Sequence, residues 1–149
     1  ESRGLGDVYK RQMYNYVNRP WRTQELVDSV LYNQYFNAPD GLSGNEDCGQ
    51  MSAWYILNSM GFYQVCPGKP VYSIGRPLFE EVTINLPDRK TFVIRTHNNS
   101  KTNKYIESVL LNGKPLDVPF FTHDDLVRGG TMEITMSPVP TEWGKQVKN

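Results

Sequence analysis

The chain has 149 residues, and its 16 basic and 16 acidic side chains give a formal net charge of zero. Charges of both signs are interspersed, so no basic stripe indicates nucleic-acid binding. No apolar run is long enough to span a membrane, and no segment resembles a secretory signal peptide. The two cysteines, Cys48 and Cys66, are too few for a disulfide framework; they could pair with each other or remain buried thiols.

The first third of the chain predicts helices. Residues 1–12 are expected to be a non-native or disordered extension, because much of this stretch resembles translated adapter sequence. Residues 13–17 predict the end of a helix, which Pro20 interrupts. Thr23 is the predicted N-cap of a second helix that ends at the turn residues 37–41. The buried face of this helix is expected to contain Val27, Val30, Leu31 and Tyr35.

The most informative stretch, residues 44–55, reads Gly-Asn-Glu-Asp-Cys-Gly-Gln-Met-Ser-Ala-Trp-Tyr. It places two carboxylates at the predicted start of a helix that runs from about residue 49 to a stop at Gly61. Unpaired N–H groups and a partial positive charge at a helix N-terminus keep carboxylates ionised, which suits a group that activates water or holds a cation. Alternatively, Glu46 and Asp47 only cap the helix, and the residues by themselves favour this alternative.

After Gly61 the apolar residues alternate, which predicts short antiparallel strands and a β-sandwich. Hairpin loops are expected at residues 87–90 and at Asn112-Gly113. Thr122 and Asp125 predict the capping box of a short helix, and a late strand is expected to contain Met132, Ile134 and Met136.

Five segments of the sequence resemble, in the same order, signature stretches of the glycoside hydrolase family 92 α-mannosidases. They cover residues 44–68, 72–79, 98–100, 111–115, and 122–126 with 129–132. The resemblance extends from about residue 13 to about residue 138. A single glycine-rich loop would be weak support, whereas five segments in one order are strong support.

The resemblance implies an α+β fold that corresponds to the C-terminal part of such an enzyme. Residues 13–68 would form the last helices of an (α/α)6 toroid, and residues 69–140 an antiparallel β-sandwich. Residues 141–149, which include Trp143, would be a polar tail. The upstream part of the same polypeptide would be missing from this chain.

The family resemblance also implies a reaction. Family 92 enzymes are calcium-dependent, inverting exo-α-mannosidases that remove terminal mannosyl residues from glycans, as in N-glycan degradation, and a periplasmic or secreted location is implied. An inverting enzyme needs a general acid and, roughly 6.5–9.5 Å away, a general base that activates water. Asp47 matches the base. Asn45 stands where many relatives have an acid and would orient the water. The general acid is expected upstream, so this chain alone is expected to be inactive.

Three further expectations concern ligands. Calcium takes about six to eight oxygen ligands, and Asp47 is a candidate for one of them. Trp21 and Trp54 are candidates for the wall of the sugar pocket, although the position of Trp54 in an amphipathic helix is also typical of a core residue. The alternative function is a non-catalytic carbohydrate-binding or interdomain β-sandwich module, with the helices as its attachment.

Overall fold

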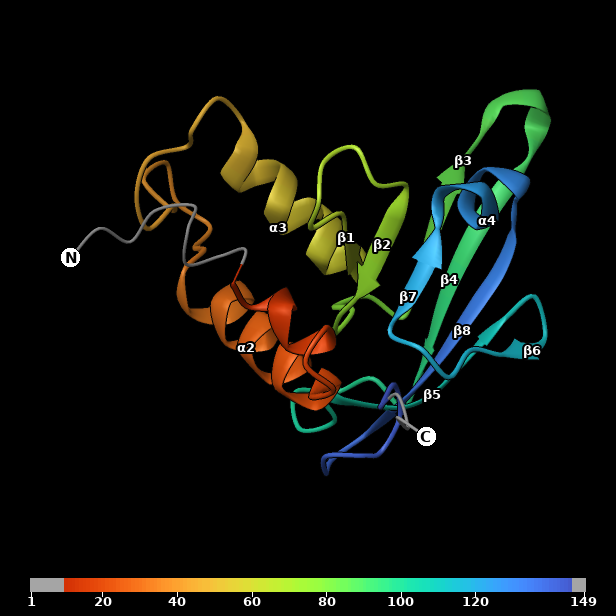
Figure 1. The fold of residues 1–149 in the computed structure, drawn as a ribbon. Coiled ribbons are helices and arrows are strands. Elements are labelled where there is room, and N and C mark those ends of the chain that lie inside the picture. Colours follow the sequence, from red (N-terminus) through yellow and green to blue (C-terminus); the bar gives the residue numbers. More distant parts are fainter. Residues whose placement is uncertain (1–9, 146–149) are drawn as a thin grey trace.

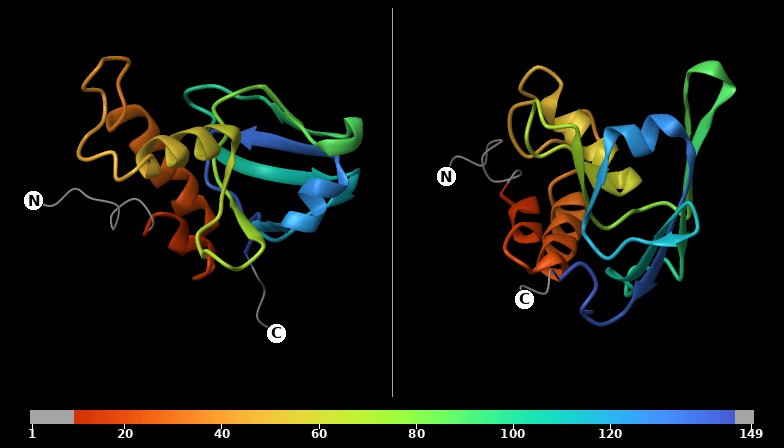
Figure 2. Two further views of the ribbon diagram at one scale, coloured as in Figure 1. Left: turned by 90° about the horizontal axis from the view of Figure 1, so that it is seen from above. Right: turned by 45° about the vertical axis from the view of Figure 1, so that its right-hand side comes forward.

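The computed structural model describes residues 10–145. Figure 1 shows helices α2 (Pro20–Asn33) and α3 (Gln50–Met60) on one side of two β-sheets. Residues 44–49, here called the acidic loop, lead into α3. Figure 2 shows the same arrangement from two further directions. Within the described range, no helix is both long and apolar enough to cross a bilayer.

Most of the extension predicted for residues 1–12 lies outside the described residues. For Gln12 the prediction of a non-native or disordered extension is wrong. Residues Gln12–Asn15 form a short 3-10 helix, η1, where the sequence predicted a helix end at 13–17. Gln12 is buried, and its Nε2 donates a hydrogen bond of 2.8 Å to Oδ1 of the buried Asn58 in α3. Gln12 therefore belongs to the fold, because it supplies a donor to the buried amide oxygen of Asn58.

Helix α2 begins four residues earlier than the sequence predicted, with Arg19 rather than Thr23 at its N-cap. Pro20 occupies its first turn, where the missing N–H is not needed and the fixed φ suits a helix. The predicted N-cap, Thr23, is instead a fully buried residue inside the helix. The helix ends at Asn33, so Tyr35 lies beyond it and forms an isolated antiparallel bridge with Leu42.

Helix α3 matches its prediction closely. Gly61 ends it in a left-handed conformation (φ 104°), which glycine adopts without steric cost. The buried side chains of α2 and α3 share one apolar cluster with Tyr63, which follows α3 in the chain. The cluster consists of Val27, Val30, Leu31, Met51, Trp54 and Tyr63.

The larger sheet has five strands in the order β3-β4-β8-β5-β6. Its strands are β3 (Glu81–Asn85), β4 (Thr91–His97), β5 (Tyr105–Leu111), β6 (Lys114–Pro115) and β8 (Gly130–Ser137). Both predicted hairpins are present: a short 3-10 helix, η2 (Pro87–Arg89), joins β3 to β4, and Asn112-Gly113 joins β5 to β6. The sequence analysis expected only antiparallel strands, but the β4–β8 pair is parallel and the sheet is mixed. The long connection between these two strands allows the parallel pairing.

The smaller sheet has the order β1-β2-β7, with strands β1 (Phe62–Tyr63), β2 (Val71–Ile74) and β7 (Phe120–Thr122). Its apolar side chains share a core with the larger sheet, and the rings of Phe121 and Phe92 stack with centroids 6.0 Å apart. The last helix, α4 (His123–Arg128), carries the predicted capping box between Thr122 and Asp125. The α+β fold class, with helices followed by packed sheets, is confirmed.

Two further details differ from the sequence analysis. Trp143, assigned to a polar tail, is buried in the core between the sheets, and its Nε1 donates a hydrogen bond of 2.8 Å to the carbonyl of Leu116. The indole both buries apolar area and satisfies its donor, which explains the burial. Cys48 and Cys66 are neither paired nor buried; both are free and exposed.

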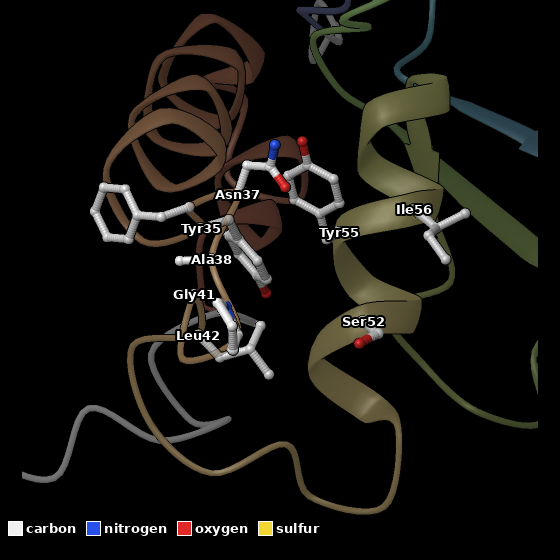
Figure 3. A pocket seen from close by; sticks show the side chains of 10 residues that line it. Tyr35, Asn37, Ala38, Gly41, Leu42, Ser52, Tyr55 and Ile56 are labelled. Carbon is white, nitrogen blue, oxygen red and sulfur yellow. The ribbon is translucent and has the colours of Figure 1, made fainter.

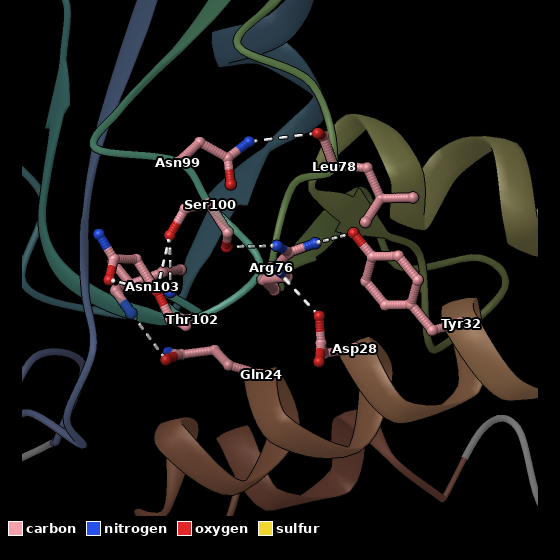
Figure 4. Close-up of polar contacts among 10 residues, drawn as sticks. Gln24, Asp28, Tyr32, Arg76, Leu78, Asn99, Ser100, Thr102 and Asn103 are labelled. Carbon is pink, nitrogen blue, oxygen red and sulfur yellow. Dashed lines mark hydrogen bonds and ion pairs between the residues drawn. The ribbon is translucent and has the colours of Figure 1, made fainter.

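A buried arginine joins the helices to the sheets (Figure 4). Arg76 follows β2, and its Nε lies 3.1 Å from Oδ1 of Asp28 in α2. Its Nη2 donates a hydrogen bond of 2.9 Å to the carbonyl of Ser100, in the loop between β4 and β5, and its guanidinium lies over the ring of Tyr32. Burial raises the pKa of Asp28 above its usual value, while the charges of Arg76 and Lys104 act in the opposite direction.

Candidate active site

The acidic loop enters α3 through a strained turn. Asp47, Cys48 and Gly49 follow one another in the left-handed region, with φ values of 53°, 58° and 91°. Only glycine adopts this conformation freely, and a non-glycine residue there costs on the order of 1–3 kcal/mol. Strain of this kind is concentrated at functional sites, so the turn is a candidate for one.

Glu46 stabilises the turn by capping α3. Its Oε1 accepts a hydrogen bond of 3.0 Å from the backbone N–H of Ser52, and its carbonyl accepts one of 3.1 Å from Met51. A carboxylate at this end of a helix is also favoured by the helix dipole. Glu46 therefore has the capping role that the sequence analysis considered for both acidic residues.

Asp47 is placed differently from Glu46. Its side chain is exposed, and within residues 10–145 no hydrogen bond or ion pair engages its carboxylate. Its backbone carbonyl accepts a hydrogen bond of 3.3 Å from Gln50, which closes the turn. The backbone is thus fixed while the carboxylate remains accessible to a water molecule, a cation or a substrate.

Side chains from two other segments hold the start of α3, next to the loop that carries Asp47. Asn45, two residues earlier on the same loop, is exposed. Gln50, in the first turn of α3, donates a hydrogen bond of 2.5 Å from Nε2 to the hydroxyl of Tyr63 in β1. The Tyr35 hydroxyl donates a hydrogen bond of 3.0 Å to the carbonyl of Met51.

Tyr35 was not recognised as a site residue from the sequence, which assigned it to the buried face of a helix. Burial is the main reason that its pKa rises to about 12, and the nearby carboxylate of Glu46 raises it further. The phenol therefore stays protonated and keeps its hydrogen bond to the start of α3. The turn that follows α2 brings it to this place; the sequence predicted a turn at residues 37–41 but extended the helix through Tyr35.

The two tryptophans proposed for a sugar pocket do not join Asp47. Trp54 has no exposed surface, and its ring stacks on Tyr35 with centroids 5.9 Å apart. It is a core residue, and the prediction that it contacts substrate is wrong, because no sugar can reach a fully buried ring. Trp21 lies in the first turn of α2, whereas the loop that carries Asp47 follows the other end of that helix. At a rise of 1.5 Å per residue, the two ends of α2 are about 20 Å apart.

Within residues 10–145, no three histidine, cysteine or acidic side chains lie close enough to share an ion. The accessible oxygens of Asp47 fit the chemistry of calcium, which prefers oxygen ligands. Asp47 could therefore supply one oxygen ligand of a calcium site.

Comparison with known proteins decides the family. Residues 10–138 match the family model described as "Glycosyl hydrolase family 92 catalytic domain". The chain belongs to glycosyl hydrolase family 92. The match includes η1, α2, α3 and both sheets, so helices and strands form parts of one family 92 catalytic domain.

Solved family 92 structures share the fold of the chain. One is the α-mannosidase BT3965 from Bacteroides thetaiotaomicron in complex with mannoimidazole, with 37% identity, a TM-score of 0.88, and coverage of 93% of this chain and 18% of that one. Another is the inverting mannosidase BT2199 of the same organism, with 42% identity, a TM-score of 0.87, and coverage of 93% and 19%.

A curated relative comes from a different organism. It is named "Uncharacterized secreted glycosidase" and comes from Arthroderma benhamiae; it is 33% identical over 135 residues, which cover 89% of this chain and 17% of that protein. The chain thus spans less than a fifth of the length of these three relatives.

Proposed function

We propose that this chain is part of a calcium-dependent, inverting exo-α-mannosidase, and that Asp47 supplies its general base. Membership of family 92 and the likeness to two mannosidase structures support the reaction class. The chain spans only 18–19% of those structures, and we assign the general acid and most of the substrate site to other parts of a longer polypeptide. The secreted relative supports a periplasmic or secreted location, with mannose-containing glycans as substrates.

One observation carries the assignment of the base: the two neighbouring carboxylates have different environments. Glu46 caps α3, whereas the exposed carboxylate of Asp47 has no hydrogen-bond or ion-pair partner within residues 10–145. If both acids were only caps, both carboxylates should meet backbone N–H groups at the start of the helix. The strained turn favours the same assignment, since it orients Asp47 without using its side chain.

In the proposed reaction, Asp47 accepts a proton from a water molecule as the water oxygen bonds to the anomeric carbon of the terminal mannose. The bond from that carbon to the glycosidic oxygen breaks on the opposite face, and the general acid of the upstream part protonates the departing oxygen. Asn45 is exposed two residues before Asp47, and we assign its amide to orientation of the same water. A bound calcium ion would hold the hydroxyls of the sugar, and Asp47 would supply one of its oxygen ligands.

The test is the kcat of Asp47→Asn in the polypeptide that carries the whole catalytic domain. Loss of a general base lowers the rate by about 10²–10⁴-fold. If Asp47 were only a cap, asparagine would replace it at a cost of a few tenths of a kcal/mol in stability, and kcat would not change.

Two further variants make this test specific. Asp40→Asn, which also removes an exposed carboxylate from the loop between α2 and α3, is the matched control and should keep kcat. Asn45→Asp should keep or raise activity, because it restores an acid that the family resemblance expects there. An Asp47→Asn enzyme with unchanged kcat and an unchanged thermal midpoint would remove the base assignment.

A further inference from the structure

The strained turn that carries Asp47 has little packing of its own. Asp47, Cys48 and Gly49 are exposed, and a Cβ placed on Gly49 would meet no other atom within 4 Å. Gly49 is the N-cap of α3, and no side chain of the described residues caps the helix there. Consecutive left-handed residues persist only where the surroundings over-determine the backbone. The restraint on this turn therefore has to come from the segments to which it is bonded.

The hydrogen bonds of the turn lead to the first helical turn of α3. The backbone N–H of Gln50 donates a bond of 3.3 Å to the carbonyl of Asp47. The N–H groups of Met51 and Ser52 donate bonds of 3.1 Å and 3.0 Å to the carbonyl and the carboxylate of Glu46. The orientation of Asp47 therefore depends on where the start of α3 is held.

Two tyrosines from different segments hold the start of α3. The hydroxyl of Tyr63, in β1, accepts a hydrogen bond of 2.5 Å from Nε2 of Gln50. The hydroxyl of Tyr35, in the loop after α2, donates one of 3.0 Å to the carbonyl of Met51. Their partners are consecutive residues of the helix, so its first turn is tied both to a strand that follows α3 and to a loop that precedes it.

Both phenol rings are fixed by packing in the apolar cluster of the helices. Tyr63 is buried, and its ring and that of Tyr35 both contact the fully buried Trp54, with centroids 6.5 Å and 5.9 Å from the indole. In Figure 3, Tyr35 also lies beside Tyr55 in the hollow between the loop after α2 and α3, with centroids 4.7 Å apart. Tyrosine has few rotatable bonds, so a packed ring gives its hydroxyl a defined position.

We propose that Tyr63 with Gln50, and Tyr35, are positioning residues for Asp47: they hold the start of α3 where the strained turn presents the Asp47 carboxylate to the attacking water. The catalytic part of this proposal rests on the proposed function. The three side chains act through the backbone of the first helical turn and not on the substrate. Their effect can be large, because a displacement of a catalytic group by about 1 Å can lower a rate by about 10²-fold.

The proposal is tested by kinetics of the polypeptide that carries the whole catalytic domain. Tyr63→Phe and Gln50→Met each remove one end of their hydrogen bond, and we expect kcat to fall by about 10–10²-fold while KM stays within about two-fold. The double variant should lose no more than either single variant, because both changes remove the same bond. Tyr72→Phe removes a hydroxyl that bonds to His123 from the neighbouring strand β2, and as the matched control it should keep kcat.

A second comparison separates positioning from general damage to the fold. In Asp47→Asn no base remains to be positioned, so Tyr63→Phe added to it should not slow the reaction further, whereas a loss of folded enzyme would slow both backgrounds equally. If Tyr63→Phe does not fold, Gln50→Met, at a partly exposed position, carries the same test. Unchanged kcat in the folded single variants, or an equal further loss in the Asp47→Asn background, would overturn the proposal.

Amide hydrogen exchange of the 149-residue chain tests the restraint without reference to the base. Exchange at Gln50 and Ser52 reports opening of the turn, and Tyr63→Phe should make it several-fold faster, whereas Tyr72→Phe should leave it unchanged. Unchanged exchange in Tyr63→Phe would contradict the restraint. Faster exchange together with unchanged kcat in Asp47→Asn would refute the base, and with it the catalytic role of the two tyrosines. Lost kcat in Asp47→Asn together with unchanged kcat in Tyr63→Phe would refute the positioning and leave the base.

Discussion

The acidic loop and the sheets differ in side-chain burial and in backbone conformation. In the sheets, large side chains such as Phe92, Ile106 and Ile134 are essentially fully buried, and each contributes about 1.5–3 kcal/mol by leaving water. The segment between α2 and α3 exposes Phe36, and a left-handed turn ends it. The buried side chains of the sheets stabilise the fold, and this stability offsets the backbone strain of the turn that carries Asp47.

The contact between the two regions is polar as well as apolar. Gln24 of α2 accepts a hydrogen bond of 2.8 Å from the backbone of Ile106 in β5, and Arg76 pairs with Asp28. Buried polar contacts of this kind fix one relative position of two elements, since any other position leaves the groups without partners. These side chains therefore fix the position of α2 relative to the sheets.

The largest expected effect concerns catalysis by the chain alone. We expect no turnover of an aryl α-mannoside by the 149-residue chain with calcium present, because our proposal places the general acid outside this chain, which spans only 18–19% of solved relatives. Two of the described glutamates have other partners: Glu25 pairs with Arg22, and Glu81 with Arg95 on the sheet. Release of the aryl group is the measurement, and a rate comparable to that of the full enzyme would contradict the prediction.

The next effect tests the link between the two regions. Arg76→Met leaves the carboxylate of Asp28 without its buried cation, and we expect a loss of about 3–5 kcal/mol in the free energy of unfolding. The double variant Asp28→Leu/Arg76→Met should recover most of that loss, because no unpaired charge remains. Urea unfolding measures both, and additive effects of the two single substitutions would show that the pair is not coupled.

A smaller effect tests the acidic loop. Glu46→Ala removes the cap of α3 and should destabilise the chain by about 0.5–2 kcal/mol, whereas Asp47→Asn should change stability by at most a few tenths of a kcal/mol, because the Asp47 carboxylate caps nothing. Asparagine is used at position 47 because it tolerates the left-handed conformation there, which alanine does not. Equal losses in urea unfolding would mean that both residues are caps.

The smallest effect concerns α4 at low pH. Hydrogen bonds from the side chain and backbone of Thr122 hold the pKa of Asp125 below its usual value. Ionised Asp125 therefore stabilises the fold at pH values above the unfolded pKa of about 3.9, and this contribution is lost as the pH falls through the lower folded pKa. Asp125→Asn should flatten the stability profile in that window, and an unchanged profile would contradict the prediction.

Local sequence was sufficient where one residue type determines the backbone. Gly61 ends α3, Asn112-Gly113 turns a hairpin, and Thr122 with Asp125 caps α4, each as predicted. The alternation of apolar residues located the strands because side chains on a strand point to opposite faces with a period of two. The resemblance to family 92 also came from the sequence alone, and the family match confirmed it.

Tertiary structure decided what depends on partners that are distant in the chain. The parallel β4–β8 pair, the burial of Trp143 and the bond from Gln12 to Asn58 join residues that no local pattern relates. The same holds for the acidic loop, because a sequence contains two adjacent carboxylates and does not say which one meets the N–H groups of α3. Only the folded turn, in which Glu46 reaches Ser52, separates the cap from the accessible acid.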